Sequence, residues 1–159
     1  MYVEKNELST EILYQGDLIK DFPFLIFDKE EPIENFTQDG ETKLNINAKL
    51  SLVMILSQTC DVQRRKNIII CPVYKVKDFE FSKDELIKIK KRRTGYWFYL
   101  PEIEGVLEES IADFQTIFYA SRKLIENYKS NKIATLSDWG RHHLGWALSG
   151  YFGRPIESK

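Results

Sequence analysis

Two continuous apolar runs lie close together in the first half of the chain and constrain its fold more than any other feature. They cover residues 50–56 (Leu-Ser-Leu-Val-Met-Ile-Leu) and 67–74 (Asn-Ile-Ile-Ile-Cys-Pro-Val-Tyr). Runs of this length and composition are typical of strands buried on both faces. The short basic segment 63–66 between them predicts a hairpin-like connection. The two strands should therefore pair antiparallel, with residues 50–56 at the centre of a sheet.

Further elements are predicted around this pair from hydrophobic periodicity and capping residues. The expected strands cover 21–28, with Pro23 near its start or on an edge, 44–48 leading into 50–56, 96–100 and 113–119. A turn is expected at Gly16-Asp17 and a surface loop at 29–42. The expected helices cover 83–93 behind a Ser82–Glu85 capping box, 121–130, and about 136–152 behind Ser137, where Gly153 and Pro155 end the helix.

This distribution predicts an α+β fold of one domain, residues 1–159, with strands at the front and helices at the back. Residues 12–120 should form a small antiparallel barrel with a helical insertion near 82–93. Residues 121–155 should form C-terminal helices packed on it. The terminal helix places Leu144, Leu148 and Phe152 on one stripe, which should face the barrel.

Composition excludes several classes of function. The chain has 159 residues, of which 43% are hydrophobic and 30% charged, and its formal net charge is only −1. Any binding to nucleic acid must therefore come from local patches. The apolar runs are too short to span a membrane, and the N-terminus lacks the pattern of a signal peptide. A cytoplasmic protein with two reduced thiols, Cys60 and Cys71, is expected.

No cofactor or metal is expected. The eight glycines are scattered and form no phosphate-loop or dinucleotide fingerprint. The two cysteines and two histidines lack the CxxC or HxxxH spacing that would preorganise a zinc site.

The candidate site is the polar stretch Ser57-Gln58-Thr59-Cys60-Asp61, which follows directly on the first apolar run. A buried strand can end at so polar a cluster only if the cluster meets water, a ligand or hydrogen-bonding partners. Ser57, Gln58, Cys60 and Asp61 are therefore expected to line a pocket or groove. The alternative is a polar strand end whose side chains cap their own turn.

Catalysis at this stretch would need a base near Cys60. The only histidines, His142 and His143, are adjacent on a predicted helix and point about 100° apart. His143 lies beside apolar positions and is the one expected to face inward. The candidate catalytic residues are Cys60, His143 and Asp61, although nothing in the spacing requires them to meet. Arg64 and Arg65 are expected at the edge of the site, with Arg154 within reach from the terminal helix, as binding residues. The alternative for His143 is a hydrogen-bonded core histidine.

Three segments of this sequence resemble MazF/PemK-type proteins: Gly16-Asp17-Leu18-Ile19, Val53-Met54-Ile55-Leu56-Ser57 and Ile69-Ile70-Cys71-Pro72-Val73. The stretch 57–61, with His143-Leu144 and Phe152-Gly153-Arg154, is similar to a bacterial group of unassigned activity. The resemblance implies an SH3-like barrel and an endoribonuclease or Cys-dependent hydrolase in a toxin–antitoxin, mobile-element or defence setting. The arginine that MazF-type ribonucleases carry before the central strand is absent, and Lys49 is the nearest cation. Their hydroxyl residue is also absent after Pro72.

Two hypotheses of function therefore stand. In the first, the barrel binds single-stranded RNA or another nucleic acid through Arg64-Arg65-Lys66 and the basic run 88–93, with Tyr96, Trp97 and Tyr99 as stacking surfaces. In the second, the chain is a non-enzymatic module whose barrel and aromatic terminal helix recognise a partner protein. The second requires an exposed apolar patch built from the aromatic residues of that helix: Trp139, Trp146, Tyr151 or Phe152.

Overall fold

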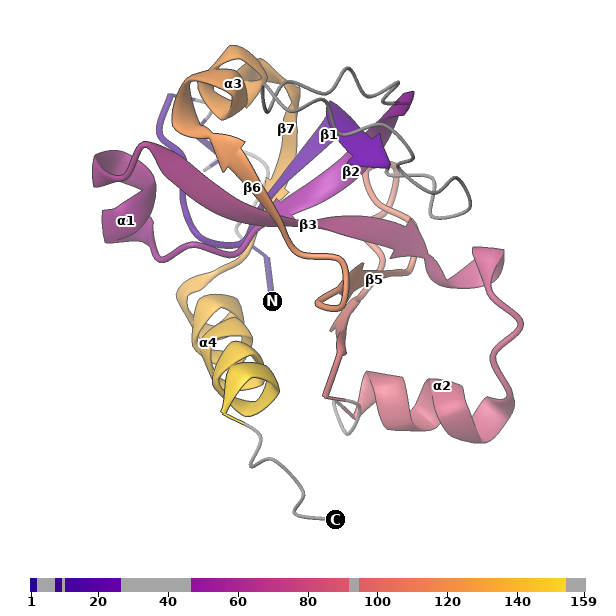
Figure 1. The fold of residues 1–159 in the computed structure, drawn as a ribbon. Coiled ribbons are helices and arrows are strands. Elements are labelled where there is room, and N and C mark those ends of the chain that lie inside the picture. Colours follow the sequence, from indigo (N-terminus) through magenta and orange to yellow (C-terminus); the bar gives the residue numbers. More distant parts are fainter. Residues whose placement is uncertain (3–7, 10, 27–46, 92–94, 154–159) are drawn as a thin grey trace, which may run out of the picture.

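The computed structural model describes residues 1–2, 8–9, 11–26, 47–91 and 95–153 (Figure 1). The strands are β1 (Asp17–Ile26), β2 (Asn47–Ile55), β3 (Asn67–Lys75), β4 (Trp97–Leu100), β5 (Ser110–Asp113), β6 (Phe118–Ser121) and β7 (Lys132–Thr135). The helices are α1 (Thr59–Arg64), α2 (Lys83–Lys90), α3 (Arg122–Asn127) and α4 (Asp138–Phe152), with 3₁₀ turns at Val76–Asp78 and Lys129–Asn131. The predicted loop 29–42 and residues 44–46 lie outside the described residues.

A curled antiparallel sheet forms a half-barrel in the order β4-β5-β3-β2-β1-β7, and β6 also pairs with β3. The predicted antiparallel pairing of the two apolar runs is confirmed, with Leu52 opposite Val73 and Ile55 opposite Ile70. Their connection is not a simple hairpin, because α1 is inserted into it. The α+β fold class is confirmed at this level.

Both faces of β2 are buried, as the continuous apolar run predicted. Met54 points into a core shared with β4, β5 and α4, whereas Val53 and Ile55 point into a second core closed by α1 and α3. Figure 1 shows α3 above the sheet and α4 below it. The half-barrel is thus covered by helices on two sides.

Two prolines and a bulge lie at points where a strand changes or loses a pairing partner. Pro72 lies between the part of β3 that pairs with β6 and the part that pairs with β5, where no N–H is needed on that side. Pro23 pairs with Leu50 of β2, beyond the short segment of β1 that pairs with β7, so the predicted edge position is confirmed among the described residues. A bulge at Lys20-Asp21 interrupts β1 and lets the strand curl.

The predicted strand 113–119 is wrong. Asp113 ends β5, and its carboxylate accepts hydrogen bonds from the Gln115 N–H and the Thr116 hydroxyl, both at 2.8 Å. This local turn reverses the chain, and β6 begins only at Phe118. Strand β7, which falls in the region predicted to be helical, was also not predicted.

The predicted helix caps are confirmed. Ser82 and Glu85 form the capping box of α2, and Ser137 caps α4. The structure adds a cap that was not predicted, Ser121 at the start of α3. The predicted stripe on α4 is only partly correct. Leu144 is fully buried and Leu148 is half-buried, but Phe152 is 64% exposed. Residues four apart advance by 400° around a helix, so Phe152 has drifted about 80° from Leu144.

Candidate functional site

The predicted site stretch lies between β2 and α1 and is partly structural. The Ser57 hydroxyl accepts a hydrogen bond of 2.8 Å from the Ile69 N–H of β3. The carbonyl of Gln58 accepts the N–H groups of Asp61 and Val62, both at 2.9 Å, and so starts α1. These bonds agree with a polar strand end that organises its own turn.

Cys60 and Asp61 lie at the molecular surface. Cys60 is exposed, with its thiol 3.9 Å from the Gln58 side-chain oxygen. Asp61 is half-buried and pairs with Arg65 one helical turn away, with 3.3 Å between the carboxylate oxygen and Nε. Both side chains thus contact the residues that flank α1, Gln58 before it and Arg65 after it. A catalytic group of Cys60, Asp61 and His143 stays a prediction.

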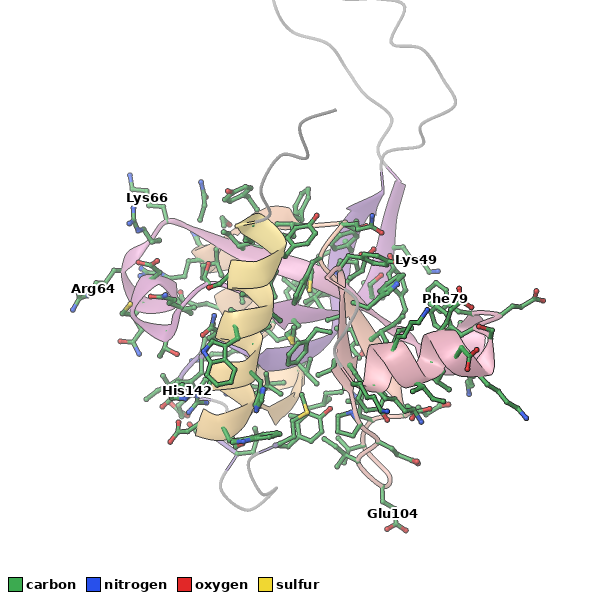
Figure 2. All side chains as sticks on the ribbon, turned by 90° about the horizontal axis from the view of Figure 1, so that it is seen from below. Lys49, Arg64, Lys66, Phe79, Glu104 and His142 are labelled. Atoms are coloured by element: carbon green, nitrogen blue, oxygen red, sulfur yellow. The ribbon has the colours of Figure 1, made fainter. Side chains whose placement is uncertain are left out.

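The basic residues of this region are exposed. Figure 2 shows Arg64 and Lys66 directed outward from the end of the molecule that holds α1. Arg64 therefore lies on a surface that a large ligand could reach. Arg154 lies outside the described residues.

His143 is half-buried on α4 between two exposed aromatic side chains, not in the core. Its ring centroid lies 4.1 Å from that of Trp139 and 5.3 Å from that of Trp146. Trp139 is 58% exposed and Trp146 is 70% exposed. We call the surface formed by Trp139, His143 and Trp146 the aromatic face of α4. As predicted, His143 is the more buried of the two histidines, but the tryptophans beside it are exposed.

The aromatic residues expected to stack on nucleic acid belong to a small core beneath α2. Trp97 is half-buried and packs against Phe79 and Phe81, with centroid distances of 5.6 and 6.2 Å. The Tyr99 hydroxyl donates to Glu109, which also pairs with Lys90 of α2 at 2.6 Å. These residues fix α2 on the sheet, which argues against a stacking surface at this position.

A buried polar group, which the sequence did not predict, joins β1 to β7. Lys132 Nζ lies 3.1 Å from the carboxylate of Asp17 and donates to the Ile12 carbonyl at 2.8 Å. The Thr135 hydroxyl and the Tyr14 N–H also donate to Asp17. Burial raises the pKa of Asp17, although these donors oppose the rise. Every polar atom of this group has a partner, so it is structural.

A groove of about 900 Å³ is lined by residues of β1, β2, β3 and β7 and by the segment 102–110. Its lining includes apolar residues and charged residues of both signs, among them Lys20, Lys49, Glu102 and Glu108. A second cavity of about 480 Å³ lies between α1, α3 and residues 11–13. Neither cavity is lined by residues 57–61, so the predicted pocket at that stretch stays a prediction.

The described residues contain no group of three or more His, Cys, Asp and Glu side chains placed to hold a metal ion. No helix among them is long and apolar enough to cross a membrane. Comparison of the sequence with protein-family models and with curated proteins found no match.

Proposed function

We propose that this chain is a protein-interaction module whose docking surface is the aromatic face of α4. The observation that carries the proposal is the exposure of Trp139 and Trp146, two of the three tryptophans in the chain. The hypothesis of an interaction module required such an exposed patch, and α4 provides it.

Energetics support this assignment. Each exposed indole carries an apolar surface whose burial is worth on the order of 2–3 kcal/mol. Tryptophan is enriched among the few residues that dominate binding energy at protein interfaces. Leu144 on the opposite side of α4 is fully buried in the core, so the helix holds the aromatic face on a rigid element.

A second candidate function is the binding of single-stranded RNA by an SH3-like, MazF/PemK-like barrel in the cytoplasm. The exposed Arg64 and Lys66 favour it, because cations at a surface can neutralise phosphates. Replacing both by glutamate should then weaken RNA binding and reduce its salt dependence. The near-neutral net charge and the packing of Trp97 beneath α2 make it the weaker candidate.

Affinity capture with the purified chain tests the interaction module. The wild type should retain a protein partner that the Trp139→Ala/Trp146→Ala variant loses. The Phe152→Ala variant is a matched control, because Phe152 is also an exposed aromatic residue of α4 but lies elsewhere around the helix. Calorimetry with the purified partner should show that the wild type and the Phe152→Ala variant bind with similar affinity and that the double tryptophan variant binds more weakly. Equal retention by all three chains would overturn the proposal.

A further inference from the structure

Two glycines of α4, Gly145 and Gly150, have no close neighbour within the molecule. A helical glycine costs about 1 kcal/mol relative to alanine, so it usually has a packing reason. Gly140 has one, because a Cβ there would lie 2.5 Å from the carbonyl oxygen of Met1. Gly145 and Gly150 have none of this kind, since a Cβ at either position would meet nothing within 4 Å. Their places around the helix distinguish them.

Gly150 lies on the aromatic face. Trp139, His143, Trp146 and Gly150 are spaced by four, three and four residues. At 100° per residue these four positions fall within an arc of about 60°. The same spacing forms the contact seam of coiled coils, in which each side chain inserts between side chains of a facing helix. The aromatic face therefore has the periodicity of a helix–helix interface.

The order of large and small residues along this seam is complementary to itself. When two copies of α4 lie antiparallel about a two-fold axis between His143 and Trp146, Trp139 lies opposite the partner's Gly150. His143 then lies opposite the partner's Trp146. The indole of Trp139 thus meets a glycine, and the indole of Trp146 meets an imidazole ring on which it can stack. Because of the two-fold axis, each of these contacts occurs twice. A parallel pair would instead place Trp139 against Trp139.

We propose that the occupant of the aromatic face is a second copy of this chain, with the two α4 helices antiparallel. This inference rests on the proposed function and names its partner. Figure 2 shows α4 in front of the other described elements, so a second helix can approach it. A two-fold contact through one helix is closed and leads to a dimer rather than a filament.

The available area sets the strength of this dimer. From their exposed fractions, the two indoles of one protomer present about 300 Å². The pair therefore contributes about 600 Å², roughly half of what a small stable interface buries. Neighbouring side chains of α4 must supply the rest. We expect a reversible dimer that forms in the micromolar concentration range.

Sedimentation velocity over a range of protein concentrations tests the dimer. The weight-average sedimentation coefficient of the wild type should rise toward that of a dimer with increasing concentration. Gly150→Leu should keep the chain monomeric, because leucine would occupy the space of the partner's Trp139. Gly145→Leu is the matched control, because Gly145 also has open space around it but lies about 140° around the helix from Gly150. It should dimerise like the wild type.

Two results would overturn the inference: a wild type that is monomeric at every concentration, or Gly150→Leu dimerising like Gly145→Leu. Thermal melts establish that both variants are folded. If the chain is monomeric but loses a captured protein on substitution of Trp139 and Trp146, the dimer is refuted while the proposed function stands. If neither association depends on these tryptophans, both proposals fail.

Discussion

Asp17 and Lys132 form a buried ion pair between two residues 115 positions apart in the chain, with 3.1 Å between the carboxylate and Nζ. Both side chains are almost completely shielded from solvent. The pair lies where β1 and β7 meet, and Asp17 also accepts the hydroxyl of Thr135. It thereby fixes the last strand to the first strand of the half-barrel.

Lys132→Met should destabilise the fold by about 3–5 kcal/mol at neutral pH, because it leaves the Asp17 carboxylate buried without its counter-ion. Adding Asp17→Asn should recover part of this loss by removing the charge. Urea unfolding of the single and double variants measures both effects. Strictly additive losses would show that the two groups are not coupled.

The loss caused by Lys132→Met should also depend on pH. Burial raises the pKa of Asp17, and Lys132 is among the groups that oppose the rise. Without Lys132 the folded state holds the Asp17 proton to higher pH than the unfolded chain does. The variant's deficit relative to the wild type should therefore be smallest near pH 4 and grow as pH rises to neutrality. A deficit that is constant over this range would contradict the assignment.

The carboxyl group of Glu109 has a pKa shift opposite to that of Asp17 and should also make stability depend on pH. Hydrogen bonds from Lys90 and Tyr99 lower the pKa of its carboxyl group. The stability it contributes is present above its ordinary pKa of 4.5 and is lost as pH falls through the lowered value. Because the side chains are partly exposed, Glu109→Gln should cost no more than about 1 kcal/mol at pH 7. Denaturant unfolding should show that the difference in free energy of unfolding between the wild type and Glu109→Gln shrinks in acid. The control Glu104→Gln, at an exposed hairpin, should change the free energy of unfolding little at either pH.

Alanine substitutions in α4 should have opposite signs at two glycines. Gly140→Ala should destabilise the chain, because the new Cβ would lie 2.5 Å from the Met1 carbonyl oxygen. Gly145→Ala should stabilise it by up to about 1 kcal/mol, since nothing lies near that position. Thermal melts of the two variants provide the comparison. A rise in both melting temperatures would contradict the close contact between the Met1 carbonyl and Gly140 of α4.

The two cysteines should differ in reactivity toward a thiol reagent. Cys60 is exposed, whereas Cys71 is completely buried in β3, and burial raises its pKa well above the usual value. One thiol per chain should react in the native state and two in denaturant. Cys60→Ser should abolish the native reaction. Rapid native labelling of that variant would show that β3 opens or that Cys71 is not buried.

The parts of the fold that were predicted from sequence are those with local signals. The runs in β2 and β3 are continuous because both of their faces are buried, and serine caps mark the starts of α2 and α4. Helix α1 was missed, although α3 of the same length was predicted, because no side-chain cap marks the start of α1. Helices this short owe their stability to tertiary packing, in this case to buried Val62.

Non-local partners explain the other misses. Lys132 belongs to a strand because its charge is matched by Asp17, and no sequence window contains both residues. The site prediction identified the aromatic residues of α4 but not their orientation. Periodicity gives the relative angles of Trp139 and Leu144, whereas tertiary packing decides which of them is buried.

The most direct test of the central claim is the solvent accessibility of Trp139 and Trp146. In a Trp97→Phe variant these two residues are the only tryptophans, so their fluorescence reports on the aromatic face alone. Acrylamide quenching should be strong in dilute protein. It should fall as the chain is concentrated or mixed with its captured partner, because a docked surface excludes the quencher. Quenching that is equally strong under all of these conditions would contradict a docking role for α4.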